Sequence, residues 1–187
     1  MATRTVAVLV GSLRKDSYNR KLGQALARLA APSLEFRFVE IGDLPLYNQD
    51  LDAAYPPAAT RLKEQVRAAD AVLFLTPEYN RAIPGVLKNA IDWGSRPYGQ
   101  SAWAGKPAAI AGASVGAVGT AAAQQQLRAI LGYLDMPTLG QPEVFLHFKD
   151  GLIDDQGTIT NEGTQKFLQG FVTKFTAWIE QISPAKG

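Results

Sequence analysis

Side chains that can bind a phosphate group follow the first apolar segment of the chain. Just after Gly11, and just before a segment with helical spacing, come hydroxyl, guanidinium and amide groups, namely those of Ser12, Arg14, Ser17 and Asn19. The N-terminus of a helix offers free backbone N–H groups and a partial positive charge, and Arg14 can add a charge-assisted hydrogen bond. The pattern therefore predicts a phosphate-binding loop. Ordinary capping of the helix by Ser17 or Asn19 is the alternative.

The glycines of the chain do not form the common nucleotide-binding motifs. A Walker loop needs Gly-Lys-Ser/Thr after four intervening residues from its first glycine, and a dinucleotide fingerprint needs a second glycine two residues after the first. Gly11 is followed by neither arrangement, and in the later glycine-rich run Ser114 stands where the second glycine is required. The sequence therefore predicts a phosphate-binding loop that is neither a Walker loop nor a dinucleotide fingerprint.

A polar loop stiffened by two prolines follows the third apolar segment. It runs from Thr76 to Pro84, and Pro77 and Pro84 restrict its backbone so that its donors and acceptors are fixed before a ligand arrives. Ligands bind to loops of this kind, at the carboxyl ends of strands, in open α/β sheets. We therefore predict a binding loop here. Its Arg81 is either a group that attracts an anionic ligand or an ordinary exposed arginine.

A third candidate loop contains the pattern Gly-x-Ser-x-Gly around Ser114. Asp135 and His147 follow it in the chain order of an α/β-hydrolase triad, so a serine hydrolase is an alternative function. Two features count against it: the chain has no His-Gly-Gly-Gly-like segment for an oxyanion hole, and His147 lies within an apolar run typical of a strand. We favour a glycine-rich binding loop in which Ser114 hydrogen-bonds a ligand.

Composition excludes several kinds of site. The chain has 187 residues, 47% of them hydrophobic, which is enough to bury the core of one domain over residues 1–187. It has no cysteine and a single histidine, so disulfides, thiolate catalysis, iron–sulfur clusters and histidine-built metal sites are not expected. Redox chemistry would have to come from a borrowed organic cofactor.

The distribution of charge and apolar residues indicates small ligands rather than large partners. The net charge is +2 and the basic residues are scattered, so the sequence gives no support for nucleic-acid binding. No apolar stretch approaches the 18 residues of a membrane span, and the apolar run near the N-terminus is too short for a signal peptide. We therefore expect a cytoplasmic protein without a membrane partner.

Five apolar segments of strand character alternate with five segments of helical spacing. The expected strands are Thr5–Val10, Glu35–Ile41, Ala71–Thr76, Pro107–Ala113 and Val144–Phe148, and the expected helices are Asn19–Ala30, Ala58–Ala69, Gly85–Trp93, Thr120–Leu134 and Asn161–Gln181. This alternation predicts an α/β three-layer sandwich with a five-stranded parallel sheet. The second strand alternates like an edge strand, which favours the flavodoxin-like order 2-1-3-4-5 and places the loops after strands one and three side by side.

Two of these loops resemble those of the NADPH-dependent FMN reductase family, in its branch of bacterial quinone and chromate reductases. Residues 76–93 resemble the family run Pro-Glu-Tyr-Asn…Pro-Gly…Leu-Lys-Asn-Ala-Ile-Asp, and residues 11–19 its Gly-Ser-Leu-Arg-x-x-Ser-x-Asn pattern. The resemblance implies that FMN phosphate binds at Ser12, Arg14, Ser17 and Asn19, and that the isoalloxazine contacts Pro77, Glu78, Tyr79 and Asn80, with Arg81 and Ser114 also at the cofactor. Ala82 departs from the family, where many relatives have serine.

The resemblance also implies an activity. A family member takes a hydride from NADPH or NADH onto FMN and then reduces a small acceptor such as a quinone, an azo compound, a free flavin or chromate, in a ping-pong reaction in which no side chain need act as acid or base. It further implies a homodimer or homotetramer, because the 44–50 loop and the Ser95-Arg96-Pro97 turn resemble family segments that contact a neighbouring subunit. A flavodoxin-type electron carrier is the alternative, although such carriers typically have an acidic face and this chain has a pI near 8.9.

Overall fold

Five parallel strands form the centre of the computed structural model, which describes residues 3–183. The strands are β1 (Arg4–Val10), β2 (Leu34–Val39), β3 (Ala71–Leu75), β4 (Ala108–Ser114) and β5 (Val144–His147). Their order in the sheet is β2-β1-β3-β4-β5, which confirms the predicted flavodoxin-like order. Because every neighbouring pair is parallel, the carboxyl ends of all the strands lie at one edge of the sheet.

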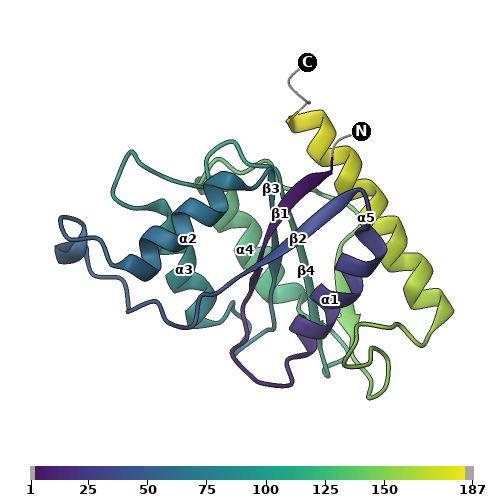
Figure 1. Ribbon diagram of the computed structural model, residues 1–187. Coiled ribbons are helices and arrows are strands. Elements are labelled where there is room, and N and C mark those ends of the chain that lie inside the picture. Colours follow the sequence, from purple (N-terminus) through teal and green to yellow (C-terminus); the bar gives the residue numbers. More distant parts are fainter. Residues whose placement is uncertain (1–2, 184–187) are drawn as a thin grey trace.

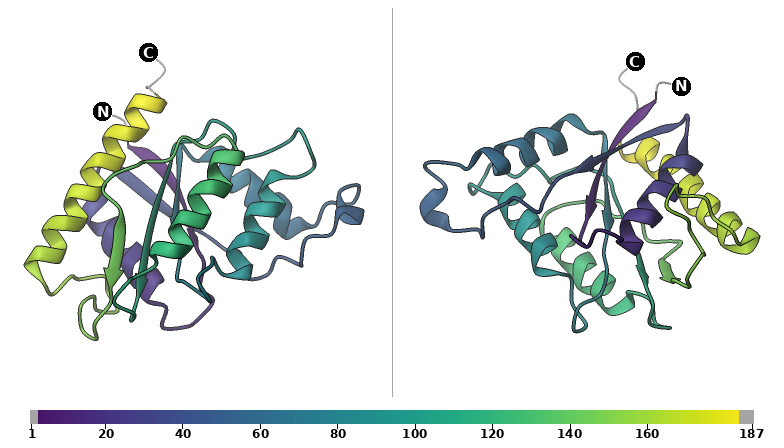
Figure 2. Two further views of the ribbon diagram at one scale, coloured as in Figure 1. Left: turned by 180° about the vertical axis from the view of Figure 1, so that it is seen from behind. Right: turned by 60° about the horizontal axis from the view of Figure 1, so that its bottom comes forward.

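Helices cover both faces of the sheet and complete the predicted three layers (Figures 1 and 2). On one face lie α1 (Tyr18–Ala30) and α5 (Glu162–Ile182), and on the other α2 (Pro57–Ala68), α3 (Gly85–Ser95) and α4 (Ala121–Tyr133). The long connection between β2 and α2 contains a short 3-10 turn, η1 (Gln49–Leu51), and extends away from the body of the molecule at the left of Figure 1.

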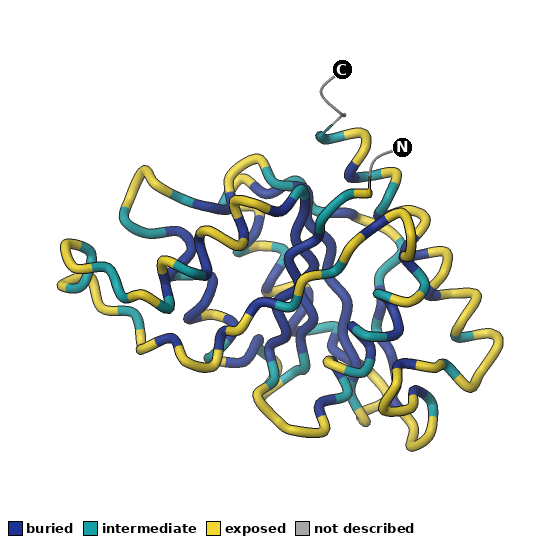
Figure 3. Tube along the Cα trace, viewed as in Figure 1, coloured by how far each residue is buried: buried dark blue, intermediate teal, exposed yellow. Residues whose placement is uncertain are grey.

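The core is divided into two clusters by the sheet. Side chains of β1 alternate between them: Val6, Val8 and Val10 face α1 and α5, whereas Ala7 and Leu9 face the other three helices. The strands at the centre of the sheet are buried along their length (Figure 3), as expected for parallel strands with helices on both faces. The edge strand β2 is half-exposed, in agreement with its alternating sequence.

The predicted and observed elements differ only at their ends. The second strand was expected to continue to Ile41, but its pairing with β1 stops at Val39, opposite Leu9. Glu40 instead accepts a hydrogen bond from the backbone N–H of Gly42 with its carboxylate, at 2.8 Å, which ends the strand.

None of the helices within residues 3–183 is long and apolar enough to cross a lipid bilayer.

A hairpin-like segment that the sequence did not reveal connects β5 to α5. Ile153 and Ile159 form an antiparallel bridge, and Oδ1 of Asp154 accepts hydrogen bonds from the backbone between them. The segment lies against α1, where Arg28 donates to the Gln156 carbonyl at 2.9 Å. Gly157, at a φ of +79°, is so close to α1 that an added Cβ would lie 2.9 Å from the carbonyl carbon of Gln24.

Replacing Gly157 by alanine should therefore destabilise the fold by two separate effects. The left-handed backbone disfavours alanine by roughly 1–2 kcal/mol, and overlap with α1 should add roughly 1–3 kcal/mol. Gly151 is a matched control, because it has a φ of +78° with no atom within 4 Å of an added Cβ. Urea unfolding should give a smaller loss of unfolding free energy for Gly151→Ala than for Gly157→Ala. Equal losses would show that the packing of this segment on α1 adds nothing.

Candidate functional site

Three loops lie side by side at the carboxyl edge of the sheet, at the bottom of Figure 1 and turned forward in the right view of Figure 2. They are the β1–α1 loop (residues 11–17), the β3–α3 loop (76–84) and the β4–α4 loop (115–120). Two glycines allow close approach here: a Cβ at Gly11 would lie 3.4 Å from Pro77, and one at Gly112 would overlap the Thr76 carbonyl. The residues predicted from sequence to form a site are thus brought to one edge.

The β1–α1 loop presents a row of free backbone donors. Within residues 3–183, the N–H groups from Ser12 to Asn19 have no hydrogen-bond acceptor. Arg14 is exposed beside them, with its guanidinium 4.9 Å from the centre of the Tyr18 ring, and Tyr18 in turn stacks on Phe148 at 4.3 Å. Interaction with the Tyr18 hydroxyl raises the pKa of the Arg14 guanidinium. The loop therefore offers a permanent positive charge and several N–H groups to an anion.

Ser17 and Asn19 face inward and are engaged in structural contacts. Ser17 is the N-cap of α1, and its hydroxyl oxygen accepts from the Arg20 N–H at 3.3 Å. Asn19 is 2% exposed and pairs with both backbone polar groups of Ala113, donating to its carbonyl at 3.0 Å and accepting from its N–H at 2.9 Å. The capping alternative thus holds for Ser17. Asn19 ties the start of α1 to the end of β4, and its predicted contact with a phosphate stays a prediction.

The β3–α3 loop contains a tight two-residue hairpin turn. Tyr79 and Ala82 exchange two backbone hydrogen bonds of 3.0 Å, and the residues between them, Asn80 and Arg81, have φ values of +52° and +66°. Two positive φ values define a type I′ turn, for which Asn is favoured at the first position and Gly at the second. Arg81 therefore occupies a backbone conformation that disfavours it by roughly 1–2 kcal/mol.

Glu78 is turned away from solvent and toward α4. Its Oε2 accepts from the backbone N–H of Ala123, in the first turn of α4, at 3.0 Å. Thr120, the N-cap of that helix, makes no capping bond of its own, so the carboxylate of Glu78 serves as the cap and lies at the positive end of the helix dipole. Oε1 lies 3.9 Å from Arg81, whose side chain is 76% exposed. Glu78 is therefore not a solvated turn residue, because its side chain is only 12% exposed.

Gln126 is a contributor to the loop that the sequence gave no reason to select. Its Oε1 accepts from the backbone N–H of Ile83 at 2.9 Å. An exposed glutamine on a helix is typical of a solvated surface, and nothing in its neighbourhood along the chain points to a loop 43 residues earlier. Only the fold brings the two together.

Ser114 lies at the end of β4 with its hydroxyl near the β4–α4 loop. Its oxygen accepts from the Gly116 N–H at 3.1 Å, which leaves the hydroxyl proton available to a ligand. Val115 and Val118 are exposed at the tip of this loop. The loop can therefore present a hydroxyl and an apolar surface beside the β3–α3 loop.

A catalytic triad cannot form around Ser114. His147 is its register partner on β5, but Asp135 lies beyond the other end of α4, where its carbonyl accepts from Gly105. The chain then returns to pair with Ala108, the first residue of β4. Asp135 and Ser114 are thus separated by the length of β4, about 20 Å for its seven residues. The serine hydrolase alternative is therefore wrong.

A hollow of about 540 Å³ lies at the opposite edge of the sheet and has no connection with these loops. Its charged residues are used by the fold: Lys106 donates to the carbonyls of Arg67 and Ala69 at the end of α2, and Asp70 pairs with Arg4 at 3.1 Å. Across the described residues no group of three or more histidines and carboxylates could hold a metal ion. The carboxyl edge remains the candidate site.

Comparison with known proteins decides the family. Residues 4–151 match the family described as NADPH-dependent FMN reductase, which is most of the chain. The chain belongs to this family. Its fold, its FMN cofactor and its use of NAD(P)H follow from that membership.

Relatives of this FMN reductase are similar over almost their full length. This chain is 53% identical to a 2-hydroxy-1,4-benzoquinone reductase of Burkholderia sp., over 93% of its own length and 95% of that protein. It is 55% identical to a quinone reductase of Pseudomonas putida, over 94% and 95% of the two chains. Among solved structures, FerB, a flavoenzyme NAD(P)H:(acceptor) oxidoreductase from Paracoccus denitrificans, matches with a TM-score of 0.93 at 50% identity, covering 96% of this chain and 98% of that one.

Proposed function

We propose that the protein is an FMN-dependent NAD(P)H oxidoreductase whose acceptors are small quinones. The observation that carries the proposal is the pairing of an anion nest in the β1–α1 loop with a rigid, exposed β3–α3 loop beside it. The names of the quinone reductase relatives support the acceptor class. Residues 1–187 would act as one domain, since both core clusters share a single sheet.

Each residue of the site then has a role in binding. The backbone N–H groups from Ser12 to Asn19, with the Arg14 guanidinium and the Ser12 hydroxyl, would hold the FMN phosphate, while Ser17 caps α1 and Asn19 fixes its position. The backbone of Pro77–Arg81 and the Ser114 hydroxyl would line the isoalloxazine. Bound FMN supplies the chemistry, by accepting a hydride from NAD(P)H and passing two electrons to the acceptor.

The proposed reaction needs no side chain as acid or base, because bound FMN would carry the hydride chemistry. The only carboxylate of the β3–α3 loop, Glu78, is engaged in capping α4. Arg81 is exposed at the rim with a long, weak contact to Glu78, so its charge is available to the NADPH 2′-phosphate or to an anionic acceptor such as chromate.

Azo compounds and free flavins are flat enough to occupy the same position as a quinone. A cytoplasmic location would give the enzyme direct access to soluble NAD(P)H.

Purified protein should bind FMN and cycle between its two redox states. Added NADPH should bleach the flavin band near 450 nm under anaerobic conditions, and a benzoquinone should restore it. Bleaching without reoxidation by quinones would contradict the acceptor class. Absence of FMN binding, measured by quenching of flavin fluorescence, would contradict the whole proposal.

Arg14→Ala should weaken FMN much more than riboflavin, which lacks the phosphate. Loss of one charge-assisted hydrogen bond reduces affinity on the order of tenfold to a hundredfold. Arg20→Ala is the matched control, because it removes a charge from the adjoining first turn of α1, where the guanidinium lies over Phe38, 5.5 Å from the ring centre. Titration calorimetry with both ligands measures the difference. Equal losses for FMN and riboflavin would place Arg14 away from the phosphate.

A homodimer or homotetramer is also part of the proposal. Leu46, in the 44–50 loop, is 84% exposed, and Tyr98, directly after the Ser95-Arg96-Pro97 turn, is 87% exposed. Both segments are held firmly on α3: the indole N–H of Trp93 donates to the Pro45 carbonyl at 2.7 Å, and the Tyr55 hydroxyl donates to the Arg96 carbonyl at 3.0 Å. Rigid segments that expose large apolar side chains are typical of interfaces.

Leu46→Glu should therefore dissociate the assembly, because it places a charge in an apolar contact. Sedimentation velocity should show the parent as a dimer or tetramer and the variant shifted toward smaller species at the same concentration. Phe167→Glu alters another exposed apolar residue, on α5, and should leave the assembly intact. A parent that sediments as a monomer would contradict the proposal.

A further inference from the structure

The contacts within the turn at the tip of the β3–α3 loop are not sufficient to stabilise its conformation. Its two backbone hydrogen bonds close only the short segment from Tyr79 to Ala82. The second central residue, Arg81, is one that the left-handed backbone disfavours, and its ion pair with Glu78 is too long and too exposed to compensate. A disfavoured conformation of this kind persists only where surrounding contacts determine it.

Those contacts come from α4, one on each side of the turn. Before the turn, the Glu78 carboxylate accepts from the Ala123 N–H, and after it, the Ile83 N–H donates to the Gln126 side chain. Ala123 and Gln126 are three residues apart and so lie on the same face of the helix. Both strands of the hairpin are thereby fixed to neighbouring points of one rigid element.

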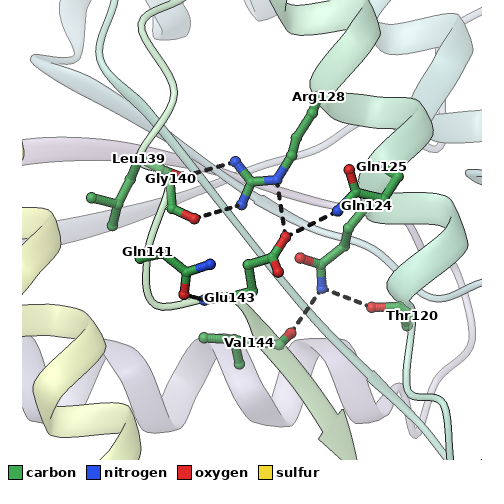
Figure 4. Close-up of polar contacts among 9 residues, drawn as sticks. All are labelled: Thr120, Gln124, Gln125, Arg128, Leu139, Gly140, Gln141, Glu143 and Val144. Atoms are coloured by element: carbon green, nitrogen blue, oxygen red, sulfur yellow. Dashed lines mark hydrogen bonds and ion pairs between the residues drawn. The ribbon is translucent and has the colours of Figure 1, made fainter.

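The helix that provides these contacts is itself anchored on its other side (Figure 4). Gln124 donates to the Val144 carbonyl at 2.8 Å, Gln125 donates to Glu143 at 3.0 Å, and Arg128 donates to the Leu139 carbonyl at 2.9 Å. These bonds join α4 to the segment that leads into β5. A movement of the β3–α3 loop relative to α4 would therefore break its own bonds and could not be followed by the helix.

We propose that Glu78 and Gln126 are positioning residues that hold the Asn80–Arg81 turn in its left-handed conformation and so preorganise the loop for the flavin. We call the two hydrogen bonds that Glu78 and Gln126 accept the clamp. The benefit to flavin binding rests on the function proposed above, whereas the clamp is a property of the protein without ligand. Glu78 acts through its side chain on α4, in addition to any contact that its backbone makes with the ring.

The clamp is tested by removing one of its bonds and then relieving the disfavoured backbone. In Gln126→Ala, the amide protons of Tyr79 and Ala82 should exchange with solvent about fivefold faster in the FMN-free protein, because the turn opens more often. FMN affinity should fall by about fivefold to tenfold, the loss expected for one hydrogen bond. Gln125→Ala is the matched control: the same side chain is removed one position away, where it contacts Glu143 and not the loop.

The second variant separates backbone conformation from charge. Arg81→Gly, combined with Gln126→Ala, should return amide exchange and FMN affinity toward the parent values, because glycine adopts a positive φ without penalty. Arg81→Ala in the same background removes the same charge but keeps the penalty, and should give no rescue. Glu78→Gln, which keeps an acceptor oxygen, should retain more of the parent's FMN affinity than Glu78→Ala.

Three results would overturn the clamp. One is unchanged exchange at Tyr79 and Ala82 in Gln126→Ala, which would show that α4 does not hold the turn. Another is equal rescue by Arg81→Gly and Arg81→Ala, which would make charge the relevant property. The third is faster exchange with unaltered FMN affinity, which would remove the turn from the flavin site. Failure of the parent protein to bind FMN would overturn the proposed function, and the exchange measurements on the FMN-free protein would still decide the clamp.

Discussion

Backbone groups at the carboxyl edge of a parallel sheet lose their partners where neighbouring strands end at different points, and buried peptide groups without partners are strongly destabilising. In this protein β3 and β4 remain in register only as far as Leu75 and Ala111. The backbone N–H and carbonyl of Ala113 lie beyond that point, and Asn19 hydrogen-bonds both of them. In the same way, the backbone N–H of Ala123 at the start of α4 is bonded by Glu78, and the backbone N–H of Ile83 after the hairpin turn is bonded by Gln126. Side chains that replace missing backbone partners are therefore what gives the three loops their shape.

In this arrangement, side chains fix the loops, and mainly backbone groups are left to contact a ligand. Asn19, Glu78 and Gln126 are long enough to cross between elements, and each points into the protein from its loop or helix. The groups left to a ligand in the proposed site are mainly backbone N–H groups, the Ser12 and Ser114 hydroxyls and two arginines. A flavin site built from main-chain atoms depends less on which side chains occupy the loops than on the contacts that fix the loops. Changes at a distance from the flavin can therefore alter its binding.

The sequence predicted the architecture because the relevant signals are local. Apolar runs such as Ala71–Leu75 and amphipathic segments such as α1 are recognised from a few neighbouring residues, and the alternating pattern of β2 identified the edge of the sheet. The phosphate-binding loop stays a prediction, made on similar grounds from a glycine and polar groups in front of a helix. The strand end at Val39 was missed by two residues because the apolar pattern continues after pairing has stopped.

What the sequence did not reveal depends on contacts between distant segments. The pairing of Asn19 with Ala113 joins residues 94 positions apart, so no local pattern could predict it. Gln126 has no local pattern at all, and the type I′ turn was concealed because Arg81 stands where glycine is usual. The hairpin between β5 and α5 likewise depends on a close fit of Gly157 against α1, which only the folded chain creates.

The exposed tips of the three loops have consequences for how the enzyme could diversify. Leu13, Tyr79, Val115 and Val118 project from the carboxyl edge, and within residues 3–183 none of their side chains takes part in a polar contact that shapes the loops. Because these side chains are exposed, mutations there should disturb folding little, and in the proposed function they border the approach to the flavin. Selection can therefore retune acceptor preference at the tips one residue at a time, and gene duplication followed by drift at these positions would yield paralogues with one scaffold and separate substrate ranges.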